Sequence, residues 1–182
     1  LPLAGAEIVL PEKSSAPEEI AAQELQSWIR KITGRELKIL AVPSADANVK
    51  LFLGRACAEK LYPEDVKKLE GRDGFAVRNS GKNIYIFGSI PKGTLNGVFA
   101  FLENNSDLIW ARPHADYGAV YTRNPNLSIV WADALEIPRS SLRGWLQNAG
   151  GGGADFPIWA VRNRCNYVGG VPSENLMYGN FT

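Results

Sequence analysis

The sequence has very few of the side chains that build disulfide frameworks, metal centres and nucleophilic triads. Its 182 residues include two cysteines, Cys57 and Cys165, and a single histidine, His114. Two cysteines at this spacing form neither a disulfide framework nor a metal site, so we expect neither to be bridged. A Ser-His-Asp triad would have to use His114, which lies in a loop-like stretch after an apolar segment. We therefore predict no metal site, no cofactor and no triad in this chain.

The sequence also lacks a charge excess and a long apolar run. Twenty basic and nineteen acidic residues give a formal charge of +1, and the basic residues are scattered among acidic ones. This balance gives no electrostatic basis for binding nucleic acid. No apolar run approaches the roughly 18 residues that a membrane span needs. Residues 1–6 lack the basic start and apolar core of an intact signal peptide, although they are compatible with the remnant of a cleaved one.

What remains has the composition of an ordinary globular protein, with 45% hydrophobic and 21% charged residues. The length suits one domain, or one domain with a piece of another. Five tryptophans and six tyrosines are more notable. Such aromatic richness suits carbohydrate contacts, although packing of aromatic rings in the core is the commoner explanation.

The stretch 92–105 is predicted to be a helix around which the chain is organised. Its apolar residues recur at positions i, i+3, i+4 and i+7, namely Leu95, Val98, Phe99 and Leu102. Thr94 is placed to cap its start. Gly97 in its interior costs about 1 kcal/mol relative to alanine, which suggests that another backbone approaches closely there. Apolar strands are expected on either side, at 83–88 and 108–111.

A second helix is predicted from Ser15 to Gly34. Ser15 and Glu18 have the spacing of a capping box, and Gly34 is suited to end the helix. Further strands are predicted at 7–11, 36–42, 50–54 and 74–78, where 74–78 forms a hairpin with 83–87, and as a pair at 117–122 and 127–132. Short helical turns are expected between residues 58 and 70.

The pattern changes near Pro138. Residues 140–146 are typical of a strand, 150–153 is a run of four glycines, and 156–168 is predicted to be a helix with Cys165 on its apolar side. This strand–loop–helix unit resembles the first βα unit of a barrel, which needs eight such units. Residues 169–182 are too few to supply the others. We therefore predict a domain over 1–134 and an incomplete barrel opening over 135–182.

Several segments in order resemble a known domain. They are a capped helix ending in ITG, then LFLGR at 51–55, DGFAVR at 73–78, NIYIFGS at 83–89 and GTLNGVFAFLE at 93–103. Together they resemble the small α/β domain that precedes the catalytic barrel in α-glucuronidases (glycoside hydrolase family 67), β-N-acetylhexosaminidases (family 20) and related uncharacterised proteins. The segment IPRSSLRGW at 137–145 is similar to the point where those barrels begin.

The resemblance implies an α+β fold of the α/β sandwich type, in which a mixed sheet of at least five strands carries two main helices on one face. It also implies a noncatalytic companion to a secreted, extracytoplasmic barrel enzyme acting on oligo- or polysaccharide. The catalytic carboxylates of those families lie on later barrel strands. No catalytic residue is therefore predicted within this chain, and self-association through residues 140–182 is expected from the open βα unit.

Three residues are candidates for substrate binding by this resemblance. Arg143 falls where hexosaminidase-like barrels carry an arginine that holds sugar hydroxyls, and a guanidinium offers several donors in a fixed fork. Trp145 and Asn148 resemble a tryptophan and an asparagine of α-glucuronidases, but Leu146 and Gln147 interrupt the expected spacing. The alternative for Arg143 is a surface or inter-domain ion pair.

Two functional hypotheses stay open from the sequence. The chain is either the N-terminal part of a glycoside hydrolase or a stand-alone carbohydrate-binding or protein-interaction module without catalysis. The module would use surface aromatic residues such as Trp110, Tyr117, Tyr121 and Trp131. The reading frame beyond Thr182 would discriminate between them. The sequence indicates neither the sugar nor its anomeric form.

Overall fold

The computed structural model describes residues 1–45, 49–145, 155–168 and 171–172. These residues belong to two compact units. The first consists of Leu1–Ser106 and Thr122–Pro138, and the second takes its described residues from Asp107–Tyr121 and Arg139–Thr182. Among the described residues, no helix is long and apolar enough to cross a bilayer.

The first unit is built on a six-stranded mixed sheet with the strand order β2-β1-β3-β5-β4-β8. Neighbouring strands are parallel from β2 to β5, whereas β4 pairs antiparallel with both β5 and β8. The sheet confirms the predicted mixed architecture. The strands are β1 (Glu7–Val9), β2 (Lys38–Leu40), β3 (Lys50–Leu53), β4 (Phe75–Ser80), β5 (Asn83–Phe87) and β8 (Ala134–Glu136).

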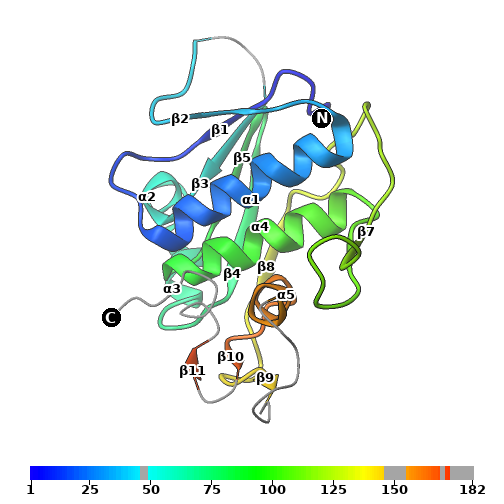
Figure 1. Cartoon of the computed structure of the whole chain (residues 1–182). Helices are drawn as coiled ribbons and strands as arrows, with labels where there is room; N and C mark the ends of the chain where they lie inside the picture. Colours follow the sequence, from blue (N-terminus) through cyan, green and yellow to red (C-terminus); the bar gives the residue numbers. More distant parts are fainter. Residues whose placement is uncertain (46–48, 146–154, 169–170, 173–182) are drawn as a thin grey trace. The chain divides into compact units, whose positions relative to one another are not determined.

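Two long helices, α1 (Ala16–Thr33) and α4 (Pro91–Asn105), pack against each other on the same face of this sheet (Figure 1). This arrangement is the one predicted. The short helices α2 (Arg55–Ala58) and α3 (Pro63–Lys68) supply a second apolar cluster, in which Ala58 and Val66 pack with Tyr85 and Phe87 of β5. Because side chains alternate along a strand, these β5 residues face away from Ile86, which lies against α4. The sheet is therefore covered on both faces.

Helix α1 has the termini that the sequence predicts. The carboxylate of Glu18 accepts hydrogen bonds from the Ser15 amide at 2.9 Å and from the Ser15 hydroxyl at 2.7 Å. At the other end Gly34 adopts a left-handed conformation with φ of 76°, and its amide donates to the Arg30 carbonyl. A capping interaction of this kind contributes about 0.5–2 kcal/mol.

Helix α4 lies unusually close to the sheet. A Cβ atom added at Gly97 would lie 2.8 Å from Ile86 Cγ2 and 3.2 Å from Phe75 Cβ. In the first turn, a Cβ at Gly93 would overlap the carbonyl oxygen of Gly74. The space at Gly97 is tight, but it is filled by the side chains of Ile86 and Phe75 and not by the predicted backbone. A neighbouring backbone approaches the helix at Gly93 instead.

The predicted capping role of Thr94 is wrong. Helix α4 begins at Pro91, one turn earlier, and Ile90 is its N-cap residue. Proline is favoured in the first turn because its missing N–H would have no partner there. Thr94 is instead fully buried inside the helix, and its hydroxyl accepts a hydrogen bond from the Gly88 amide at 3.2 Å.

The predicted pairing of 117–122 with 127–132 is also wrong, although Ala119–Val120 do form a short strand that pairs elsewhere. In the first unit, the amide of Ile129 donates to Leu1 O at 2.7 Å, and Leu127 O accepts from the Leu3 amide. The side-chain oxygen of Asn105 holds the amides of residues 130 and 131. The strand that pairs with β4 at the edge of the sheet is β8, a short strand that the sequence analysis missed.

The second unit contains two small sheets. Strands β6 (Ile109–Trp110) and β7 (Ala119–Val120) pair antiparallel, while β9 (Gly144–Trp145), β10 (Tyr167–Val168) and β11 (Val171–Pro172) form a separate sheet. Strands β9 and β10 are parallel, with helix α5 (Phe156–Arg162) between them in the chain.

The helix predicted over 156–168 is therefore too long. Arg164 has a φ of 58°, a left-handed conformation that does not continue a helix, and the chain then enters β10. Cys165 lies beyond the end of α5 and not on its apolar side. It is buried beside Ala160, with Phe156 and Trp159 packed against them.

Substituting Gly97 tests the close approach of α4. In Gly97→Ala the added methyl must displace Ile86 or Phe75, and overpacking of this kind costs about 1–3 kcal/mol. The gain in helix propensity is at most about 1 kcal/mol. We expect a lower free energy of unfolding in urea denaturation. Gln23→Ala, at an exposed position of α1, should change it by no more than about 0.5 kcal/mol. Equal stability of both variants would contradict the packing described for α4.

Candidate functional site

The predicted site residue Arg143 lies immediately before β9, where its backbone is fixed by Asn166. The Arg143 amide donates to Asn166 Oδ1 at 2.8 Å, and the Arg143 carbonyl accepts from the Asn166 amide at 2.7 Å. The next residue, Gly144, has no room for a side chain, because a Cβ atom there would overlap the carbonyl oxygen of Tyr167. The start of β9 is therefore held tightly against the start of β10.

The guanidinium group of Arg143 donates to carbonyl oxygens of its own unit. Nη1 donates to Ser140 O at 2.9 Å, while Nε and Nη2 donate to Arg164 O at 3.3 and 3.2 Å. These bonds tie the segment before β9 to the turn before β10, and they orient the side chain. The role of Arg143 in holding a sugar stays a prediction.

The other two predicted binding residues are described only in part. Trp145 belongs to β9, and its backbone lies opposite Val168 of β10. Asn148 lies outside the described residues. Arg143 and Trp145 thus lie at the same strand, β9. Asn166, which sequence reasoning missed, holds the backbone of Arg143 in place. Asn166 also donates from Nδ2 to Ser141 O at 2.8 Å. No local signal points to Asn166, because its segment was predicted to be helical.

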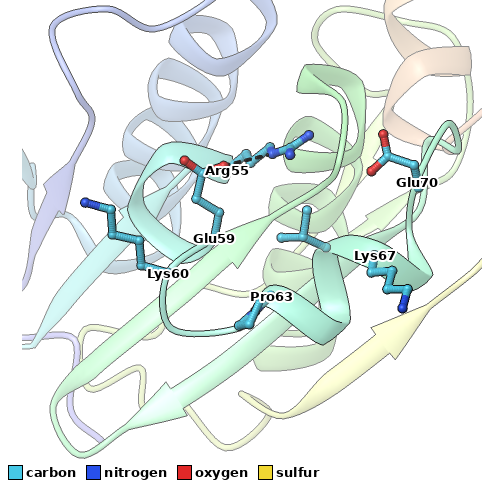
Figure 2. A pocket seen from close by; sticks show the side chains of 7 residues that line it. Arg55, Glu59, Lys60, Pro63, Lys67 and Glu70 are labelled. Atoms are coloured by element: carbon cyan, nitrogen blue, oxygen red, sulfur yellow. Dashed lines mark hydrogen bonds and ion pairs between the residues drawn. The ribbon is translucent and has the colours of Figure 1, made fainter.

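The first unit has a shallow hollow of about 340 Å³ beside α2 and α3 (Figure 2). Arg55 Nε pairs with Glu59 Oε2 at 3.0 Å across one side of it, and both side chains are substantially exposed. Such an exposed pair contributes about 0.3–0.5 kcal/mol. The hollow is lined by Arg55, Glu59, Lys60, Pro63, Val66, Lys67 and Glu70. This lining holds no histidine, cysteine or serine and no aromatic ring, so it supplies neither a histidine-activated nucleophile nor a stacking surface.

A second hollow of about 340 Å³ in the first unit is lined by the N-terminal residue Leu1, by Asn79 and by residues 129–133. It contains one acidic side chain, Asp133, which is largely exposed and paired with Arg78. A single paired carboxylate cannot carry out the two-carboxylate chemistry of glycoside hydrolysis.

Burial and pairing within the fold account for the shifted pKa values of Arg78 and Cys57. Arg78 donates to Asp65 at 2.6 and 3.1 Å, and this bond is the main reason that the pKa of Arg78 is raised. Burial raises the pKa of the Cys57 thiol to about 11, and the nearby Glu18 carboxylate adds to the shift. A thiol with so high a pKa is a poor nucleophile at neutral pH.

No metal centre is visible in the part of the chain that the structure describes, since no three histidine, cysteine, aspartate or glutamate residues are grouped to hold an ion. The aromatic residues named for a binding module are mostly covered. Trp110 is 5% exposed, and Tyr121 and Trp131 are half-buried, whereas Tyr117 is 62% exposed.

Comparison with known proteins gives a consistent picture. The model of the family described as "Glycosyl hydrolase family 67 N-terminus" matches residues 4–101. A curated relative, "Probable alpha-glucuronidase A" of Aspergillus terreus, is 25% identical over 133 residues. That match covers 69% of this chain but only 14% of the relative.

Solved structures resemble the chain in fold. A Streptomyces plicatus N-acetyl-β-hexosaminidase aligns over 90% of this chain and 29% of its own, with 18% identity and a TM-score of 0.57. A family GH115 4-O-methyl-α-glucuronidase with specificity for decorated arabinogalactans aligns over 90% of this chain and 25% of its own, with 12% identity and a TM-score of 0.55. The chain thus spans a small part of each relative.

Alkylation kinetics test the environment of Cys57. Raising the pKa from 9.0 to about 11 lowers the thiolate fraction near pH 8 by about 100-fold. We expect iodoacetamide to modify Cys57 at least that much more slowly in the native chain than in urea, as measured by peptide mass spectrometry. Because the thiol ionises more easily when unfolded, its contribution to stability should fall as the pH rises from about 9 to 11.

Glu18 and Glu19 provide a matched pair for this measurement. A Cβ atom at Gly54 would lie 2.5 Å from Glu18 Oε1, which places this carboxylate at the start of α2, where Cys57 lies. Glu18→Gln should accelerate alkylation of Cys57, since glutamine keeps a capping-box side chain but removes the charge. Glu19→Gln should not change the rate. An equal rate for native and unfolded chains would refute the raised pKa.

Proposed function

The chain belongs to the family described as glycosyl hydrolase family 67 N-terminus, and from this membership we propose that it is the noncatalytic N-terminal part of a glycoside hydrolase. Residues 1–134 form the accessory domain, and residues 135–182 begin a catalytic barrel that continues beyond Thr182. The accessory domain supports the barrel, and the whole protein acts on complex carbohydrate outside the cytoplasm.

The arrangement β9–α5–β10 is the observation that carries this proposal. Two parallel, hydrogen-bonded strands joined through a helix are the repeating unit of a (β/α)₈ barrel. Gly144 and Arg143 lie where the first of these strands pairs with the second. The lengths of the relatives support the same conclusion, because the matched regions make up 14–29% of the curated relative and of the two solved structures.

The two hollows and the shifted pKa values support a noncatalytic role for the first unit. Glycoside hydrolysis by the common mechanism needs two carboxyl groups about 5–10 Å apart flanking the scissile bond. The hollow at residues 129–133 has a single carboxylate, Asp133, which is paired with Arg78. The hollow beside α2 and α3 has two, Glu59 and Glu70, but Glu59 is paired with Arg55 and no aromatic ring lines the hollow to bind a sugar. The buried polar groups of this unit instead connect its helices and strands. Asp65 of α3, for example, pairs with Arg78 of β4.

Activity of two lengths of the protein tests the proposal. The 182-residue chain should not hydrolyse aryl glucuronides or aryl N-acetylhexosaminides, because on this proposal the acid and base of the reaction lie on later barrel strands. A protein that includes the rest of the reading frame should hydrolyse a glycoside. Turnover by the 182-residue chain above that of a mock purification would contradict the noncatalytic assignment, and a reading frame that stops at Thr182 would favour the stand-alone module.

Arg143 is tested in the longer protein. Losing charged hydrogen bonds worth about 1.5–3 kcal/mol should lower kcat/KM of Arg143→Ala by roughly 10²-fold. Because Arg143 also ties Ser140 to Arg164, the thermal unfolding temperature must be measured beside activity. Arg139→Ala, which removes an exposed cation nearby, is the control. Full activity of Arg143→Ala would leave the residue a purely structural role.

A further inference from the structure

The loop between β6 and β7, residues 111–118, has a backbone that is fixed from within. The amides of Ala111 and Arg112 both donate to Gly118 O, at 2.8 and 3.1 Å, and the His114 amide donates to Arg112 O. Gly118 is required by this closure, since a Cβ atom there would overlap the His114 carbonyl oxygen. The 111–118 loop is therefore a tight, preformed turn.

Helix α5 of the same unit holds this loop at two further points. Asp155 Oδ2 accepts a hydrogen bond from the Ala115 amide at 3.0 Å. Trp159 Nε1 donates to Trp110 O at 2.9 Å, at the position where β6 leads into the loop. The loop thus has a defined position on its own unit even though most of its side chains are exposed.

Three exposed side chains gather on the loop, and we call them the Arg112–His114–Tyr117 cluster. The rings of His114 and Tyr117 stack with their centroids 4.2 Å apart. The guanidinium carbon of Arg112 lies 5.9 Å from the centre of the Tyr117 ring. Tyr117 as a residue remains 62% exposed beside these two neighbours.

The polar atoms of the cluster are only partly used. His114 Nδ1 accepts from the amides of Asp116 and Tyr117, at 3.1 and 3.4 Å, which leaves the proton of the neutral ring on Nε2. Arg112 donates from Nε to Tyr117 O at 3.4 Å. Within the described residues, the structure gives no partner to the terminal guanidinium nitrogens, to His114 Nε2 or to the Tyr117 hydroxyl.

These features together suit one kind of ligand. The exposed part of the stacked His114–Tyr117 pair offers an apolar surface on which the C–H face of a pyranose can pack. The Tyr117 hydroxyl and the His114 Nε2–H can bond to sugar hydroxyls. The free end of the guanidinium has the planar, two-donor shape that matches a carboxylate. A sugar that carries a carboxylate, a uronic acid, uses all of these groups at once.

We propose that the Arg112–His114–Tyr117 cluster is a noncatalytic binding subsite for a uronic-acid residue of a glycan. The choice of a glycan over other carboxylates rests on the proposed function. All three residues of the subsite lie in the 111–118 loop. Binding there would therefore require neither the catalytic barrel nor hydrolysis. It would hold an acidic polysaccharide on the enzyme while the reaction takes place elsewhere.

The test uses the 182-residue chain and two forms of one polymer. The first is an arabinogalactan bearing glucuronic acid, and the second is the same polymer after chemical reduction of its carboxyl groups. We expect the chain to be retarded by the acidic polymer in affinity electrophoresis and to bind the reduced polymer about 10-fold more weakly, which is the loss expected for one charged hydrogen bond.

Variants assign the binding to the cluster. Tyr117→Ala should weaken binding of both polymers at least 10-fold, whereas Tyr117→Phe, which keeps the ring, should retain most of it. Arg112→Gln should lower affinity for the acidic polymer to that for the reduced one. Arg35→Ala, which removes an exposed cation of the first unit, should bind like the unchanged chain. Circular dichroism must show the same folded signal for each variant.

The outcomes separate this proposal from the proposed function. Absence of binding by the unchanged chain, or unaltered binding by Tyr117→Ala, overturns the subsite, even if a longer protein hydrolyses glycosides. Equal affinity for the acidic and reduced polymers overturns the assignment of Arg112 to a carboxylate. Binding that follows the expected pattern supports the subsite even if a longer protein shows no hydrolysis, a result that would overturn only the proposed function.

Discussion

The first unit depends on how closely helix α4 approaches the sheet. Glycine at 93 and 97 lets the helix backbone lie almost directly on β4 and β5, and Gly74 and Gly88 leave the space opposite its first turn. Every residue of α4 from Lys92 to Leu102 is buried as a result. Burial of large apolar side chains contributes about 1.5–3 kcal/mol each. Helix α1 can then pack along α4 and cover the remainder of the same face.

The elements that the sequence predicts well are those whose signals are local. The capping box at Ser15 and Glu18, the glycine after α1 and the apolar spacing of α4 each lie within a few residues of the element that they define. Strand β8 had no such signal, because three residues acquire their strand character only by pairing with β4. The start of α4 was misplaced because threonine is a favoured N-cap residue, whereas the observed N-cap is Ile90. Burial against Gly88, a tertiary contact, decides otherwise.

The candidate sites differ in the same way. Arg143 could be selected from the sequence because a family pattern places an arginine at that strand. Its partners could not be, since the turn at Arg164 and Asn166 replaces the end of a predicted helix. Tyr117 was selected only as one aromatic residue among several. Its distinction from Trp110 comes from exposure, which depends on how the loop closes on Gly118 and how α5 holds it.

Polar side chains in the first unit differ in their contacts from those of the Arg112–His114–Tyr117 cluster. In the first unit, paired charged side chains contact other parts of the same unit. Arg78, for example, forms ion pairs with Asp65 and Asp133. Leaving such groups unpaired inside a fold would cost more than their pairing contributes, so these contacts are explained by stability alone. The Arg112–His114–Tyr117 cluster does not fit that explanation. Its backbone bonds already close the loop, and the outward-facing donors add nothing to that closure. A fixed loop that presents uncommitted donors beside an aromatic ring has low reorganisation cost on binding, and that makes recognition the better account of these three side chains.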